Sequence, residues 1–268
     1  MVAAFEGWND AGEAATMALR SLAESWSARR IASVDPEEFY DFSETRPQVH
    51  LVDGLTRRIE WPANELWVAA APAHDVVLVL GVEPQLRWRT FCAGLLGAAT
   101  GLGVELTITL GALLADVPHT RPVRVTGAAH DPDLAERLGL QRSRYEGPTG
   151  IVGVLHDACA AAGLPSASLW AAVPHYVHQV PSPKAALALV ERAAVLVGAS
   201  VDAAPLREAA DEYERQVSEQ VEADEDAAAY VARLEAADDA EHEAERSLPS
   251  ADALAAEVEN FLRDHRRD

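Results

Sequence analysis

The run Val76-Val77-Leu78-Val79-Leu80 restricts the possible folds of this chain more than any other segment. Side chains of a strand point alternately to its two faces, so an unbroken apolar run is typical of a strand covered on both faces. Strand-like and helix-like segments alternate over residues 1–200 and supply the helices that such a sheet needs. We therefore predict a three-layer α/β domain with a largely parallel central sheet.

Hydrophobic periodicity places the individual elements of this domain. Helices are predicted at residues 11–25, 88–102, 131–138, 151–162 and 183–197. Strands are predicted at residues 2–5, 30–34, 49–53, 56–61, 66–71, 76–81, 104–110, 123–126 and 168–173. The stretch 49–61 turns at Asp53-Gly54 and so predicts an antiparallel hairpin beside the parallel strands.

The composition of the chain changes near residue 204. Residues 205–268 hold 20 acidic and 7 basic side chains, which account for more than half of the net charge of −21. Proline and glycine are absent between Leu206 and Leu248, and apolar residues recur there at helical spacing in one thin stripe. We predict a core domain at residues 1–204 and an acidic helical segment at residues 205–268. This segment should hold one long helix and a shorter one that Ser250 caps.

Charge and cysteine usage exclude several classes of function. The net charge of −21 argues against a nucleic-acid partner and against an anionic membrane. Cys92 and Cys159 form no close pair in the sequence, so neither a disulfide framework nor a zinc knuckle is indicated. The sequence contains no signal peptide and no run of 18 apolar residues. We therefore expect a soluble protein in the cytoplasm, with reduced, buried thiols.

Polar clusters lie at the predicted strand ends and in loops, where α/β folds bind their ligands. The candidate pocket consists of Trp8, Asn9, Asp10, Glu83, Trp88, His119, Arg121, Tyr145, Thr149, Gly150, His175 and Tyr176. In such a pocket Asp10 or Glu83 would act as the acid or base. Arg121, with the loop amides at Thr149 and Gly150, would hold an anion. Trp8 or Trp88 would stack on a ring.

The same residues also have purely structural explanations. Asn9 or Asp10 can cap a helix, and the loop prolines and glycines can fix turns. His175 and His178 are three residues apart, but no third ligand has a recognisable spacing, so no metal is predicted. No serine or cysteine lies in a nucleophile elbow, and no phosphate loop with its lysine is present. The residues thus indicate a candidate pocket without a reaction, and no cofactor is predicted.

These clusters resemble the proteasome assembly chaperone 2 family in its bacterial, actinobacterial-type branch. The matching stretches are residues 5–15, 39–42 with 46–47, 81–84 with Trp88, 118–122, 145–151, 170–176, 181–183, and 248–250 with 261–263. The resemblance implies a core similar to the purine nucleoside phosphorylase/hydrolase fold, extended by C-terminal helices, and it implies self-association. Eukaryotic members of the family help to assemble the α-ring of the 20S proteasome, and archaeal relatives act on proteasome complexes.

Three hypotheses about function follow. The first is a non-enzymatic assembly factor that binds itself and proteasome subunits, with no nucleic-acid or membrane partner. The second is an enzyme or small-molecule binder with a nucleoside-phosphorylase-like pocket, or with an activity like that of a carboxylate–amine ligase. The third is a structural homo-oligomer that buries the polar loops between subunits. We favour the first, because the family resemblance points to it and the sequence contains no recognised catalytic constellation.

The two ends of the sequence bear on the first hypothesis. The terminal residues His265-Arg266-Arg267-Asp268 lack the hydrophobic-Tyr-any ending with which assembly and activator proteins often dock on proteasome α-rings. We therefore expect any docking to use another surface. The resemblance also implies residues before the Phe5 turn that complete the first strand. Met1-Val2-Ala3-Ala4 leaves that strand short, so we expect that translation starts further upstream.

Overall fold

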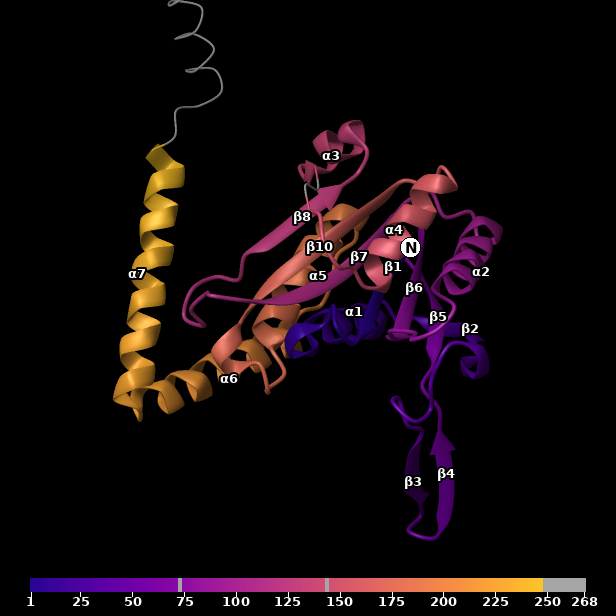
Figure 1. The fold of residues 1–268 in the computed structure, drawn as a ribbon, viewed down its shortest axis with the longest axis horizontal. Helices are drawn as coiled ribbons and strands as arrows, with labels where there is room; N and C mark the ends of the chain where they lie inside the picture. Colours follow the sequence, from indigo (N-terminus) through magenta and orange to yellow (C-terminus); the bar gives the residue numbers. More distant parts are fainter. Residues whose placement is uncertain (72–73, 143–144, 248–268) are drawn as a thin grey trace, which may run out of the picture. The chain divides into compact units, whose positions relative to one another are not determined.

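The computed structural model describes residues 1–71, 74–142 and 145–247 (Figure 1). The chain divides into two compact units, Met1–Glu219 and a second unit from Gln220 onward. The division lies within helix α6 (Ala204–Glu222). The domain boundary that we expect between residues 204 and 205 stays a prediction.

An eight-stranded sheet forms the centre of the first unit. In order across the sheet, its strands are β2 (Arg29–Val34), β5 (Asn64–Ala70), β6 (Asp75–Val82), β1 (Val2–Glu6), β7 (Thr107–Ala115), β10 (Ser166–Pro174), β8 (Val125–Ala129) and β9 (Gln141–Arg142). Strands β6, β1, β7 and β10 are parallel, with Phe5 opposite Gly81 and Leu169 opposite Leu110. Strands β2 and β5 at one edge and β8 near the other add antiparallel pairs. The largely parallel centre is thus confirmed.

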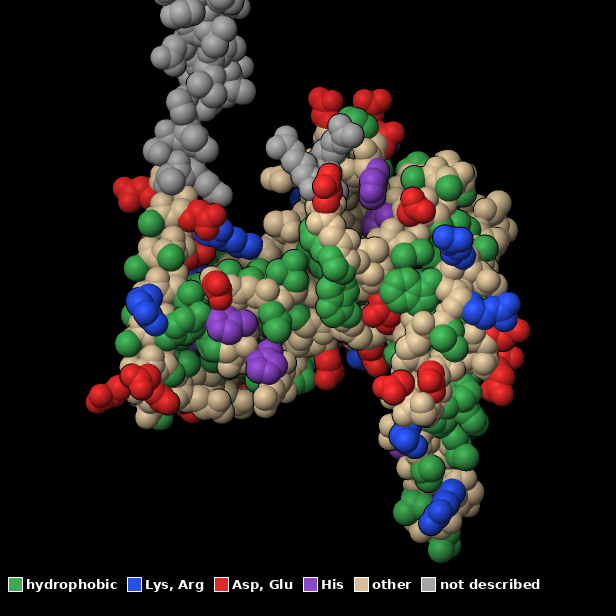
Figure 2. Space-filling model, in the orientation of Figure 1, with side chains coloured by type: hydrophobic (Ala, Val, Ile, Leu, Met, Phe, Trp, Pro, Cys, Tyr) green, Lys and Arg blue, Asp and Glu red, His purple; other side chains and the backbone are tan. Residues whose placement is uncertain are grey.

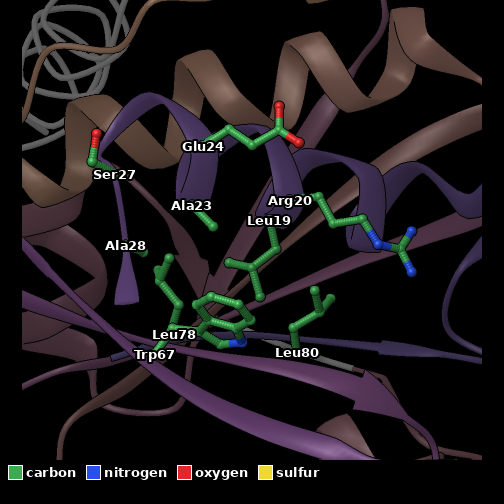
Figure 3. Close-up of a pocket in the computed structure, with 9 residues that line it drawn as sticks. All are labelled: Leu19, Arg20, Ala23, Glu24, Ser27, Ala28, Trp67, Leu78 and Leu80. Carbon is green, nitrogen blue, oxygen red and sulfur yellow. The ribbon is translucent and has the colours of Figure 1, made fainter. Parts of the chain in front are cut away.

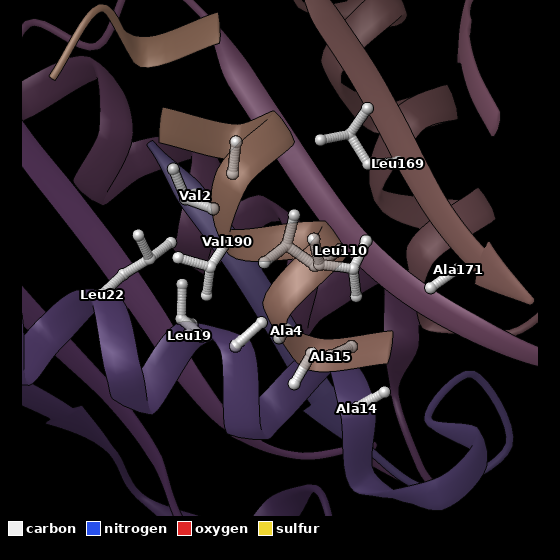
Figure 4. Packing of buried hydrophobic residues seen from close by; sticks show 14 of the residues in the cluster. Val2, Ala4, Ala14, Ala15, Leu19, Leu22, Leu110, Leu169, Ala171 and Val190 are labelled. Carbon is white, nitrogen blue, oxygen red and sulfur yellow. The ribbon is translucent and has the colours of Figure 1, made fainter. Parts of the chain in front are cut away.

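Helices cover both faces of the sheet. One core cluster packs α1 (Ala14–Ser25) and α5 (Pro183–Val197) against the sheet (Figure 4). The other packs α2 (Trp88–Gly101) and α4 (Ile151–Ala161) against the opposite face. Successive residues of β1 show the alternation, because Val2 and Ala4 belong to the first cluster while Ala3 and Phe5 belong to the second. The three-layer α/β class is confirmed, and the specific likeness to nucleoside phosphorylases stays a prediction.

The predicted hairpin at residues 49–61 is present as a two-stranded sheet of its own. Strand β3 (Gln48–Val52) pairs antiparallel with β4 (Thr56–Glu60), and the pair extends away from the eight-stranded sheet (Figure 1). At its base the rings of Phe42 and Trp61 meet edge to face, with centroids 4.8 Å apart. The chain therefore presents a hairpin whose strands share no hydrogen-bonded ladder with the main sheet.

The long helix predicted from Leu206 is wrong, because the chain forms two helices there. Helix α6 ends at Glu222, and α7 (Glu225–Ser247) begins three residues later. Asp224 separates them, since its Oδ1 accepts hydrogen bonds from the backbone N–H groups of Asp226 at 2.9 Å and Ala227 at 3.1 Å. A side chain that caps a new helix competes with continuation of the old one. The short helix predicted after Ser250 lies outside the described residues.

Other boundaries also differ from those predicted. Strand β7 begins and ends later than the predicted residues 104–110, and strand β9 was not predicted. Helix α3 (Pro132–Leu138) forms where a helix was predicted, at residues 131–138. The apolar stripe of α6 is real, since Leu206, Ala210, Tyr213 and Val217 are buried. No helix among residues 1–71, 74–142 and 145–247 combines the length and the apolar character that crossing a bilayer requires.

Candidate functional site

The carboxylate of Glu83 joins three segments at the carboxyl ends of the parallel strands. Glu83 follows β6, and its Oε1 accepts hydrogen bonds from the backbone N–H of Ile151 at 2.7 Å and from Nδ2 of Asn9 at 3.2 Å. Its Oε2 accepts from the backbone N–H of Trp8 at 3.4 Å. Because Ile151 is the first residue of α4, the negative charge also lies at the positive end of that helix. Glu83 therefore fastens the turn after β1 to the start of α4.

Two glycines allow the backbone to approach this carboxylate closely. A Cβ atom on Gly150 would lie 2.2 Å from Nδ2 of Asn9 and 2.6 Å from Oε1 of Glu83. Gly7 has a φ of 131°, a backbone conformation that residues with a Cβ atom rarely adopt. The glycines that flank the predicted pocket are thus required by the packing around Glu83.

Asp10 is committed to the first turn of α1. This carboxylate is buried, and its Oδ1 accepts from the backbone N–H groups of Ala15 at 2.7 Å and Thr16 at 3.3 Å. Its Oδ2 accepts from the Thr16 hydroxyl at 2.5 Å. Burial raises the pKa of Asp10, and the hydrogen bonds to Thr16 and Ala15 oppose that shift. Asp10 serves the helix start as a capping residue would.

A second polar group surrounds His119, which is 3 % exposed in the loop after β7. The Tyr176 hydroxyl accepts a hydrogen bond from the His119 backbone N–H at 2.8 Å and lies 2.8 Å from its Nδ1. Nε2 of His119 lies 3.0 Å from Oγ of Ser218 on α6. The Lys184 ammonium donates to the His119 carbonyl and pairs with Glu214 of α6. This group fastens α6 to the strand-end loops.

The remaining predicted residues are spread over several loops. Nδ1 of His175 lies 3.0 Å from Oδ1 of Asp116, while Nδ1 of His178 lies 2.9 Å from the His175 carbonyl oxygen. Arg121 is half-buried in the same loop as His119. Three others bond within their own segments: Tyr145 to the Pro148 carbonyl at 2.8 Å, Thr149 to the Gly150 carbonyl at 3.5 Å, and the Trp88 indole to the Pro84 carbonyl.

The structure therefore brings Trp8, Asn9, Glu83 and Gly150 together in one group and His119 with Tyr176 in another. In both groups, these polar side chains form hydrogen bonds with other residues of the same chain. A single working pocket formed by all twelve residues stays a prediction. With this geometry established, the comparison with known proteins is decisive for the family: a model of the PAC2 family matches residues 4–221.

The chain belongs to the PAC2 family. A PAC2 family protein from Streptomyces avermitilis is 49 % identical, with a TM-score of 0.79 over 86 % of this chain and 98 % of that one. A proteasome-assembly chaperone homologue from Mycobacterium tuberculosis is 50 % identical, with a TM-score of 0.78 over the same shares. An archaeal proteasome activator from Pyrococcus furiosus, 19 % identical, shares the fold with a TM-score of 0.65 over 81 % of this chain and 91 % of that one. No curated protein matches the chain.

The resemblance to the actinobacterial-type branch is thus confirmed. Sequence reasoning missed the partners that complete the two polar groups of this PAC2 chain. Ser218 and Glu214 belong to an acidic helix in which nothing distinguishes them from their neighbours. Lys184 was conspicuous as the only lysine of the chain, but its spacing did not reveal the bond to His119, 65 positions away.

An apolar pocket of about 260 Å³ lies elsewhere in this PAC2 chain, between α1 and strands β5 and β6 (Figure 3). Its lining residues are Leu19, Arg20, Ala23, Glu24, Ser27, Ala28, Trp67, Leu78 and Leu80. A hollow of about 490 Å³ lies at the opposite ends of the strands, beside Val2, Val76 and Leu106. Neither hollow contains a residue of the predicted pocket.

Proposed function

We propose that this PAC2 family member is a non-enzymatic assembly factor that binds protein partners in proteasome-related complexes, acts as a homo-oligomer and works in the cytoplasm. The single observation that carries the proposal is the contrast around Glu83. The Glu83 carboxylate accepts from two backbone N–H groups and from the Asn9 amide, while Trp8, whose backbone donates to it, is 65 % exposed. Tyr145, in the loop before α4, is 67 % exposed.

The carboxylates of the predicted pocket are poorly placed for acid–base work. A general acid or base must reach the proton that it transfers. Both oxygens of Glu83 already accept from Trp8, Asn9 and Ile151, and Asp10 is buried against Thr16. Chemistry at either group would first require these bonds to break.

The exposed aromatic residues suit a protein partner. Trp and Tyr are enriched among the residues that dominate binding energy at interfaces. The backbone of Trp8 is held by Glu83, and the Tyr145 hydroxyl donates to the Pro148 carbonyl. The Tyr145 side chain, which this bond fixes before binding, therefore loses little conformational freedom on binding. A related chain of 50 % identity is described as a proteasome-assembly chaperone homologue, which supports proteasome α subunits as the partner.

We expect Trp8→Ala and Tyr145→Ala each to weaken binding to purified proteasome α subunits of the same organism by roughly 10-fold or more, since hot-spot truncations cost about 2 kcal/mol. Affinity is measured by biolayer interferometry at low and moderate salt. Val195→Ala is the matched control, because Val195 is 70 % exposed on α5 and should leave affinity unchanged.

Circular dichroism shows whether each variant keeps its fold. No binding by the folded wild type at any salt concentration would overturn the choice of partner. Binding that neither aromatic substitution weakens would overturn the surface around Glu83 as the contact. Turnover of a nucleoside or of a carboxylate–amine pair by wild type, lost in Glu83→Gln, would favour the enzyme hypothesis instead.

A further inference from the structure

The β3–β4 hairpin presents an apolar face that no described part of the chain covers. All ten of its strand residues are exposed. Val49 lies opposite Ile59 and Leu51 opposite Arg57, so these four share one face of the hairpin. Val49 is 56 %, Leu51 62 % and Ile59 55 % exposed, and Leu55 at the turn is 88 % exposed. An isolated two-stranded hairpin is at best marginally stable in water, so such a face calls for a partner.

The charge of the hairpin differs from that of the rest of the chain. Residues 46–61 contain three arginines and two acidic residues, whereas the whole chain has a net charge of −21. Arg57 and Arg58 make no ion pair with any residue that the structure describes. Figure 2 shows basic and apolar side chains together along this hairpin. We call this hairpin, residues 48–60, the arm. A basic, apolar arm is complementary to an acidic surface, and a second copy of this chain, with its net charge of −21, offers such a surface.

The pocket beside α1 fits the tip of this arm. Leu19, Ala23, Trp67, Leu78 and Leu80 line it with apolar groups (Figure 3). Its volume of about 260 Å³ exceeds the roughly 150 Å³ of an apolar cavity that takes up benzene. It therefore has room for a branched aliphatic side chain together with part of a turn.

One charged group of the pocket also calls for an incoming group. Glu24 at its rim is exposed and makes no ion pair with the described residues, whereas Arg20, which also lines the pocket, is paired with Glu6. A basic residue of an incoming segment would pair with Glu24.

We propose that the hairpin tip of one copy, led by Leu55, inserts into the α1–β5–β6 pocket of a second copy. Leu55 fills the apolar interior, and Arg57 or Arg58 pairs with Glu24. This inference rests on the homo-oligomer of the proposed function and names its contact. Because the arm and the pocket are different surfaces, the contact is heterologous and closes into a ring when the rotation between copies permits.

Sedimentation velocity on the full chain tests the contact. We expect Leu55→Asp to weaken self-association by roughly 100-fold or more, because it places an unpaired charge in an apolar pocket. Arg57→Glu combined with Arg58→Glu should weaken it, as should Glu24→Arg, and joining the three reversals in one chain should restore part of the loss. Leu102→Asp is the control, since Leu102 is 46 % exposed after α2 and outside both surfaces.

A crosslinking measurement does not depend on the stability of the charged variants. Mixing Leu55→Cys with Ser27→Cys under a mild oxidant should give a covalent dimer, and neither variant alone should give as much. The chain's own Cys92 and Cys159 are buried, so the background is low.

The outcomes distinguish the hairpin–pocket contact from the homo-oligomer of the proposed function. An oligomer that none of the hairpin or pocket substitutions disturbs, with no specific crosslink, overturns this contact and leaves the homo-oligomer standing. A wild-type chain that is monomeric at every concentration overturns both, while binding to α subunits is judged by its own assay. Loss of α-subunit binding in Leu55→Asp with unchanged self-association also overturns the inference, because the arm then serves the other partner.

Discussion

Replacing Glu83 with alanine should lower the free energy of unfolding by about 3 kcal/mol, because hydrogen bonds to a charged group contribute about 1.5–3 kcal/mol each and this side chain accepts several. The substitution leaves the backbone N–H groups of Trp8 and Ile151 without their acceptor. It also removes the negative charge from the start of α4. Urea unfolding followed by circular dichroism measures the loss, and we expect Tm to fall by roughly 6–12 °C.

Two further variants separate the role of the charge from that of the hydrogen bonds. Glu83→Gln keeps one acceptor oxygen and should lose about half as much stability as Glu83→Ala. Glu44→Ala, at an exposed carboxylate, should change stability by no more than about 0.5 kcal/mol. If Glu83→Ala proved as stable as wild type, the carboxylate would not be holding the loop, and Glu83 would again be a candidate acid or base.

Most of the sheet could be predicted because its apolar runs and alternations are local properties of the sequence. The run from Val76 to Leu80 indicates two covered faces without any knowledge of what covers them, and β6 is indeed buried between the two helical layers. The hairpin at residues 49–61 could be predicted for the same reason, because Asp53-Gly54 is a short-range turn signal between two strand-like runs.

The parts that could not be predicted depend on contacts between distant residues or on competition between local ones. Asp224 breaks the C-terminal helix, although the periodicity continues through it and the segment lacks proline and glycine. His119 meets Ser218 across 99 positions, and Glu83 meets Ile151 across 68. Residue type identified Glu83 and His119 as notable, but only packing reveals that their hydrogen-bonding capacity is used within the chain.

The second large predicted effect is a loss of stability at low pH, and it comes from His156 of α4. This imidazole is buried and bonds to residues of β7 and β10. Its Nε2 lies 2.8 Å from Oγ1 of Thr109, and its Nδ1 lies 2.8 Å from Oγ of Ser166. Burial, and to a lesser degree the charge of His130, lower the pKa of His156 from 6.5 to about 4. Between these two values the unfolded chain binds a proton that the folded chain excludes. Stability therefore falls as the pH drops from 6.5 to about 4.

We expect this group alone to cost the folded chain about 2 kcal/mol at pH 5 and about 3 kcal/mol at pH 4, at about 1.4 kcal/mol for each unit of pKa shift. His156→Gln removes the titration and keeps groups that can bond to both hydroxyls. Its stability relative to wild type should therefore rise by these amounts between pH 7.5 and pH 4, as urea unfolding at matched pH values would show. The carboxylates common to both chains cancel in this difference. A difference curve for His156→Gln that stays flat with pH would mean that the folded chain protonates His156 as readily as the unfolded chain does.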